Sequence, residues 1–222
     1  ALLKMLGSES RELKRATLTA LPGILLGSKE QQMLRSLVDP VLKAKAMRVL
    51  GEPFFSADRP KLTDVDGWVR FLENVPGTPD LEHGREVFLS PRLGGCAVCH
   101  RASGLGNLAG PDLSTIGSAL DVRSIVESLV QPSANVAPQY EAYSITVKGA
   151  EPMVAFELSE RGGSHRYIDL AGHLVDVKIE DLVRRDRLPV SIMPEGLVMR
   201  LTDAEVRDLV VFLASSGGQY TR

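Results

Sequence analysis

The only two cysteines of this chain lie three positions apart, and a histidine follows the second one directly. Residues 95–100 read GCAVCH, which places Cys96, Cys99 and His100 in one short stretch. Three chemistries use two thiols at this spacing: a redox-active disulfide, half of a tetrahedral zinc site, and covalent attachment of a c-type haem. The surrounding sequence must distinguish among them.

Neither the disulfide nor the zinc interpretation agrees well with the surrounding sequence. A thioredoxin-like disulfide would open a helix just after a buried strand, whereas here a helical pattern precedes the cysteines and a glycine-rich loop follows them. A structural zinc site needs four ligands. It would have to recruit two of His83, His165 and His173, none of which shows a paired ligand spacing.

Covalent haem attachment uses every residue type in the motif. The thiols of Cys96 and Cys99 are spaced to reach the two vinyl groups of one porphyrin. His100, held beside them, can offer an imidazole nitrogen to the iron as the proximal ligand. The sequence therefore favours one covalently attached haem c.

The helices predicted on both sides of this motif carry a further pattern. Residues 80–135 and 188–216 resemble a class I cytochrome c, in which a helix with glycine four residues before an aromatic residue crosses the C-terminal helix. Gly84 and Phe88 match this pattern. Glycine suits a helix crossing because it permits close backbone approach. The residues expected opposite them are Leu209, Phe212 and Leu213.

The resemblance also implies the surroundings of the iron. The family carries Gly-Pro-x-Leu after the cysteines, matched here at residues 110–113, and it implies that the carbonyl of Pro111 accepts a hydrogen bond from His100. It also implies that a methionine followed by proline, Met193 here, supplies the sixth ligand. Leu113, Ile116 and Ile125 are expected to pack on the porphyrin, and Arg101 or Arg123 to pair with its propionates.

The combination of motifs is similar to the planctomycete and verrucomicrobial haem-binding (CxxCH) C-terminal domain. That resemblance implies a mainly α fold: a cytochrome c helical fold that carries a four- to five-stranded antiparallel β block at about residues 140–187. The alternating apolar and polar pattern that begins at Tyr140 agrees with such a block.

Two domains are expected. Residues 1–76 read as short helices, one of which starts with Asp39-Pro40, and they resemble the end of a HEAT-like repeat region. An ordinary helical hairpin remains the alternative. Residues 77–222 are expected to form the cytochrome c domain with the β block inserted, and the linker is placed at residues 76–79, which read PGTP.

A haem with both axial positions filled by protein transfers single electrons, and a thioether ligand raises its reduction potential. We therefore predict an electron-transfer domain with no catalytic residues of its own. The resemblance implies a periplasmic or otherwise exported protein, the C-terminal module of a larger dehydrogenase-like polypeptide, with redox proteins as partners. Two alternatives stay open: a catalytic or gas-sensing haem with an open or bis-histidine site using His165 or His173, and an interaction scaffold with an accessory haem.

Composition narrows the other classes of function. The 222 residues include 26 basic and 28 acidic ones, well mixed, so the formal charge is −2 and no nucleic-acid surface is expected. The one basic run, residues 184–187, is interrupted by Asp186 and predicts a solvated strand edge. No segment approaches the roughly 20 apolar residues of a membrane helix. The first residues do not form a signal peptide, and we expect a fragment of a longer polypeptide.

Overall fold

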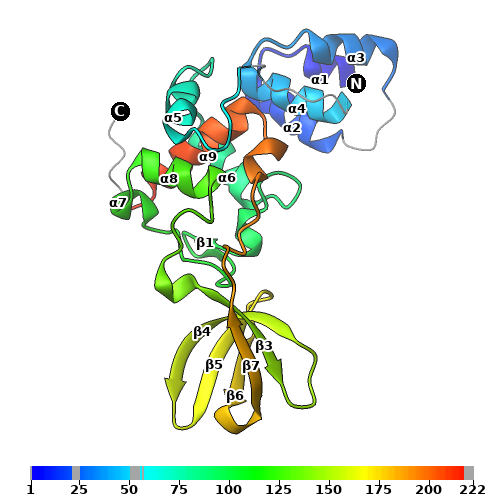
Figure 1. Cartoon of the computed structure of the whole chain (residues 1–222). Helices are drawn as coiled ribbons and strands as arrows, with labels where there is room; N and C mark the ends of the chain where they lie inside the picture. The colour runs from blue at the N-terminus through cyan, green and yellow to red at the C-terminus, as the bar shows by residue number, and fades with distance from the viewer. Residues whose placement is uncertain (1, 22–25, 51–55, 57, 218–222) are drawn as a thin grey trace.

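The structure of this chain is a computed structural model, which describes residues 2–21, 26–50, 56 and 58–217. Figure 1 shows a helical N-terminal unit, a larger helical unit, and a curved β-sheet beneath it. The predicted domain of residues 1–76 includes positions 1, 22–25, 51–55 and 57, which lie outside the described residues.

Four helices form the N-terminal unit: α1 (Leu2–Leu6), α2 (Arg11–Ala20), α3 (Ser28–Arg35) and α4 (Pro40–Leu50). Ser10 caps α2 through a hydrogen bond from the backbone N–H of Leu13 at 3.1 Å, which satisfies one of the free amides of the first turn. The unit has its own core, which contains Leu6, Leu18, Leu21, Leu34, Leu42 and Ala46.

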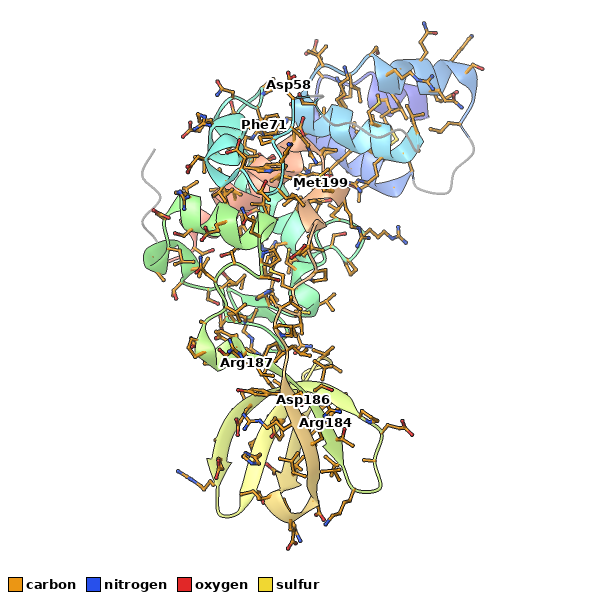
Figure 2. The ribbon with its side chains drawn as sticks, in the orientation of Figure 1. Asp58, Phe71, Arg184, Asp186, Arg187 and Met199 are labelled. Atoms are coloured by element: carbon orange, nitrogen blue, oxygen red, sulfur yellow. The ribbon has the colours of Figure 1, made fainter. Side chains whose placement is uncertain are left out.

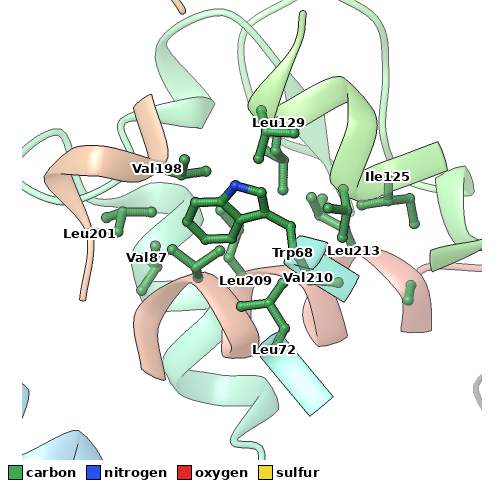
Figure 3. Close-up of a cluster of buried hydrophobic side chains, with 14 of the residues drawn as sticks. Trp68, Leu72, Val87, Ile125, Leu129, Val198, Leu201, Leu209, Val210 and Leu213 are labelled. Atoms are coloured by element: carbon green, nitrogen blue, oxygen red, sulfur yellow. The ribbon is translucent and has the colours of Figure 1, made fainter. Parts of the chain in front are cut away.

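The larger helical unit contains α5 (Val65–Glu73), α6 (Leu81–Leu89), α7 (Ile116–Ala119), α8 (Val122–Val130) and α9 (Asp203–Ser215). Its core surrounds Trp68, which is fully buried (Figure 3). Trp68 and Leu72 both belong to this core, so α5 packs with the second unit. The boundary predicted at residue 76 lies after α5. The two hydrophobic cores, in contrast, are separated before α5.

The helices α6 and α9 cross at Gly84. A Cβ at this position would lie 2.0 Å from the carbonyl oxygen of Asp208, so only glycine lets the two backbones approach this closely. Beside the crossing, the rings of Phe88 and Phe212 lie 5.6 Å apart. The predicted contact between these two helices is confirmed at these residues.

Five antiparallel strands form one sheet: β3 (Ala142–Val147), β4 (Met153–Arg161), β5 (Ser164–Asp169), β6 (Leu174–Lys178) and β7 (Leu182–Arg187). Their order is β6-β5-β4-β3-β7, so the short 3-10 helix η3 (Ile179–Asp181) joins the two outer strands. One face buries Ile145, Ala155, Tyr167 and Val177. The other buries Ala142, Phe156 and Ile168.

The outer strand β7 carries the interrupted basic run. Figure 2 shows Arg184, Asp186 and Arg187 along this strand. Arg184 pairs with Asp186 at 2.5 Å with both side chains exposed. The predicted solvated strand edge is confirmed, and charges on an edge strand disfavour pairing with another sheet.

The predicted fold class is wrong. The structure contains 43% helix and 18% strand, with the five-stranded sheet and a second sheet made of β1 (Arg101–Ala102) and β2 (Leu105–Gly106). This is an α/β fold, not a mainly α cytochrome c helical fold with a small β insertion. The physical reason is that the strands pair mainly with one another and bury cores of their own on both faces.

The N-terminal unit contacts the larger unit through ion pairs. Arg15 and Lys45 both bond to Glu86 on α6, at 2.8 and 2.6 Å. Arg48 pairs with Glu205 on α9, whose side chain is fully buried. Among the described residues, no helix has the length and apolar character needed to cross a membrane.

Candidate functional site

The cysteine motif lies directly after α6, on a short turn. Gly95 has φ +66°, a left-handed conformation that favours glycine, and it begins the 3-10 helix η1 (Cys96–Val98). The amides of Cys99 and His100 both donate to the carbonyl of Cys96, at 3.1 and 2.8 Å. The motif therefore folds as one tight turn that begins at Cys96 and continues to His100.

Both cysteines are free and only partly exposed. Burial raises the pKa of the Cys96 thiol to about 11, opposite to the lowered pKa typical of a redox-active CxxC pair. Within the described residues, the only group of three or more potential ligands that converge within 4.8 Å lies in the sheet and does not include Cys96, Cys99 or His100. The geometry thus gives no support to the disulfide or zinc interpretations.

The imidazole of His100 is oriented by the residue that the sequence indicated. Its Nδ1–H donates to the carbonyl oxygen of Pro111 at 2.9 Å. Burial lowers the pKa of His100, although the Pro111 carbonyl opposes this change, so the neutral, ligating form is favoured near neutral pH. The structure gives the other nitrogen, Nε2, no hydrogen-bond partner among the described residues.

Glycines allow the following loop to fold closely over His100. A Cβ at Gly110 would lie 2.8 Å from Cε1 and 2.9 Å from Nδ1 of the His100 ring, and one at Gly106 would lie 2.1 Å from the His100 carbonyl oxygen. The amide of Gly110 also donates to the carbonyl of Cys99 at 2.6 Å. The loop that contains Gly106 and Gly110 therefore holds the His100 ring on one side. The sequence did not indicate this role of Gly110.

Met193 and Cys96 border the same hydrophobic core. Both side chains are partly buried and pack against the core around Trp68, as do Leu113 and Ile116. The amide of Met193 donates to Ser191 Oγ at 3.1 Å, which fixes the short segment before the methionine. The predicted sixth ligand thus borders the same hydrophobic core as the motif, and its side chain is only partly buried.

The two arginines expected near the propionates have different surroundings. Arg123 pairs with Asp66 at 2.8 Å on the exposed side of α8, so it is committed elsewhere. Arg101, next to the motif, has a buried Nε with no hydrogen-bond partner among the residues described. Of the three predicted porphyrin contacts, Ile125 is buried in the core at 3% exposure, whereas Leu113 and Ile116 are partly buried at its border.

The two histidines considered for a bis-histidine site belong to the sheet. His165 is buried and bonds to Glu157 at 2.6 Å. His173 is 76% exposed and lies 3.2 Å from Asp169. The turn that contains His173 contacts the motif loop, since Asn107 Nδ2 donates to the Ala171 carbonyl at 3.1 Å. No pattern in the sequence indicated this contact.

Comparison with known proteins adds no family assignment. The chain matches no protein-family model, and a search of curated proteins returned no match. The resemblance to c-type cytochromes therefore depends on the residues themselves: the CxxCH sequence at 96–100, Pro111 and Met193.

Proposed function

We propose that this chain carries one covalently attached haem c and acts as a one-electron carrier. Cys96 and Cys99 would form thioethers to the porphyrin, and His100, through Nε2, and Met193 would hold its iron. The observation that carries the proposal is the His100 ring: Pro111 accepts the bond from Nδ1–H, Nε2 has no hydrogen-bond partner among the described residues, and both cysteines of the same turn are free.

The residues present fit a haem group in several respects. A metal-bound histidine almost always donates its other N–H to a carbonyl, a carboxylate or water, and Pro111 accepts that bond here. Because Gly110 has no side chain, its backbone can lie close against the His100 ring. The unpartnered Nε of Arg101 offers a donor beside the motif for an anionic group such as a propionate.

The protein residues then perform distinct tasks. Thioethers from Cys96 and Cys99 would fix the position of the group, and Pro111 orients His100 and raises its basicity as a ligand. Met193, whose amide donates to Ser191, would supply the second protein ligand and exclude substrates and water from the iron. When bound, such a His/Met-ligated haem supplies a single electron-accepting and electron-donating centre.

The wider setting is also part of the proposal. Haem c attachment implies export, so the chain would act in the periplasm or another exported setting and exchange electrons with redox proteins. A dehydrogenase domain of the same polypeptide is the expected donor. The N-terminal helices, read as HEAT-like, would serve as the connection to such a domain, and catalysis would belong to that partner.

Covalent attachment is tested by expressing the chain together with a cytochrome c maturation system. We expect a mass increase of one haem that survives denaturation, and reversible one-electron reduction. The double variant Cys96→Ala/Cys99→Ala should lose all covalent haem, whereas His173→Ala should keep it. Absence of covalent haem in the wild-type protein, with His173→Ala equally unmodified, would overturn the proposal.

The same preparation distinguishes the alternative haem functions. A fully reduced protein that does not react with carbon monoxide supports the carrier, because both axial positions are filled. Rapid carbon monoxide binding would instead indicate an open site for catalysis or gas sensing. The scaffold alternative predicts that haem is dispensable for partner binding. Deletion of residues 1–56, which removes the N-terminal helices, tests whether those helices carry that binding.

A further inference from the structure

One face of the five-stranded sheet contains a second cluster of ligating side chains. Nδ1 of His165 and one carboxylate oxygen each of Glu157 and Glu160 lie within 4.8 Å of one another. His165 Nδ1 is 2.6 Å from Glu157 and 3.9 Å from Glu160. This cluster belongs to β4 and β5, far along the chain from the cysteine motif.

A β-bulge brings the two carboxylates to the same face. In a regular strand, residues three apart point to opposite faces. The pairing of β4 with β5 shifts between Glu157 and Ser159: Glu157 lies opposite Tyr167, and Glu160 lies opposite His165. Since His165 and Tyr167 are two apart in β5, both glutamates share their face. Bulges often re-aim side chains in this way.

A second observation points to a missing ligand. The hydroxyl of Tyr167 is buried and has no hydrogen-bond partner in the part of the chain that the structure describes, and the whole residue is 0% exposed. Its ring lies 5.8 Å from that of His165, and it stands directly opposite Glu157. A buried hydroxyl without a partner destabilises the fold, so an occupant that accepts or donates a bond there would remove this cost.

The charges of the cluster suit a cation. Glu157 also pairs with Arg185, whose guanidinium lies 3.9 Å above the ring of Tyr143. With His165 neutral, two carboxylates and one guanidinium leave one net negative charge. A divalent ion would reverse that charge, while Arg185 would hold Glu157 in place as an outer partner.

We propose that Glu157, Glu160 and His165 form a binding site for a divalent transition-metal ion, with the Tyr167 hydroxyl as an additional ligand or as a partner of a metal-bound water. The presence of an imidazole favours zinc and its neighbours over magnesium and calcium, which prefer oxygen ligands alone. With zinc–ligand distances of about 2.0–2.2 Å, binding would require Nδ1 of His165 to lose its proton and separate slightly from Glu157, now 2.6 Å away, and Glu160, whose side chain is 62% exposed, to move inward.

The site is tested in a background that removes the cysteine motif. In Cys96→Ala/Cys99→Ala protein, Zn²⁺ titration by calorimetry should show one site, and Co²⁺ should give visible bands without thiolate charge transfer. This test is therefore independent of haem attachment. Mg²⁺ at the same concentrations should bind at least 100-fold more weakly.

Three variants assign the binding to these residues. Glu160→Gln, at an exposed position that leaves the sheet intact, should weaken Zn²⁺ binding about 10- to 100-fold, and His165→Ala should abolish it. His173→Ala, which changes an exposed histidine of the same sheet, should bind as before. Equal Zn²⁺ affinity in Glu160→Gln and the background protein, or no binding to the background protein, would overturn the proposal.

Discussion

The cysteine motif and the acidic-histidine cluster of the sheet represent two ways of building a site. In the motif, Cys96, Cys99 and His100 lie within five residues of the sequence and fold as a single turn. In the sheet, Glu160 meets His165 through strand pairing, and Glu157 joins their face only because a bulge shifts the register. The first kind of site can be recognised in a sequence, whereas the second needs a structure.

The two regions also depend on different hydrophobic cores, so a substitution that disrupts one core should leave the other region stable. The largest effect is expected at Gly84. Gly84→Ala places a Cβ 2.0 Å from a backbone carbonyl that cannot move aside. We therefore expect the free energy of unfolding of the larger helical unit to fall by about 3 kcal/mol. Residue-resolved hydrogen exchange should show faster opening around the motif while the sheet remains protected.

The control for this change is Gly149→Ala in the turn between β3 and β4. Gly149 has φ +71° and no atom near an added Cβ, so the cost should be only about 1 kcal/mol. It should affect the sheet and leave the motif unchanged. Simultaneous opening of both regions in Gly84→Ala would show that the sheet is not an independent unit.

A smaller and more local effect is expected in the motif loop. Gly110→Ala would place a Cβ 2.8 Å from His100 Cε1, so the ring must rotate and its bond to Pro111 must weaken. We expect haem attachment to persist because the cysteines are unchanged, while the absorption spectrum and the reduction potential shift.

Gly104→Ala is the control in the same loop, because an added Cβ there meets no atom within 4 Å and its φ of +80° adds only backbone strain away from the His100 ring. Its spectrum should match the wild-type spectrum. If both variants shift equally, strain of the loop explains the result, and Gly110 has no specific role beside the His100 ring.

In the sheet, Tyr167→Phe tests whether the buried hydroxyl lacks a protein partner. Burial raises the pKa of Tyr167, and its hydroxyl has no hydrogen bond among the described residues. Removing it should leave the metal-free protein unchanged or stabilise it by up to about 1 kcal/mol in denaturant unfolding. A loss of more than about 2 kcal/mol would mean that the hydroxyl is already satisfied.

The smallest effect concerns the contact between the two helical units. Burial alone would raise the pKa of Glu86, but hydrogen bonds from Lys45 and Arg15 outweigh it and lower the pKa overall. A lowered pKa stabilises the folded state above the unfolded value, near pH 4, and this contribution disappears as pH falls through the folded value. Each such pair contributes at most about 1 kcal/mol.

The expected result is a weakening of this contact below about pH 4, measured by hydrogen exchange of the N-terminal helices. Glu86→Gln should show the weaker contact already at pH 7 and a flatter pH dependence. Glu82→Gln, an exposed position on the same helix, should behave as the wild type. Identical profiles for all three proteins would exclude Glu86 as the group responsible.

Much of the local structure followed from the sequence. The contact at Gly84 and Phe88 and the bond between His100 and Pro111 were expected from the resemblance to class I cytochromes c, and the structure contains both. The charged edge at residues 184–187 was expected from the interrupted basic run. The motifs that carry these expectations are short and local in sequence, although Gly84 meets Asp208 on the distant helix α9.

The predicted fold class was wrong because the extent to which the strands form a layer of their own depends on the tertiary structure. Alternation predicted strands after Tyr140, but it could not show that five strands bury cores on both faces and form a layer of their own. The Asn107–Ala171 contact and the cluster around His165 were missed for the same reason. Glu157 and Glu160 are three apart, a spacing that alternation assigns to opposite faces.

The central claim is that His100 and Met193 hold the iron of a covalently attached haem. The most direct test is to record absorption and magnetic circular dichroism spectra of the oxidised and reduced protein after maturation, together with Met193→Ala. We predict low-spin His/Met features in the wild type and their loss in the variant. A high-spin wild-type spectrum, or a variant spectrum identical to the wild type, would contradict the claim.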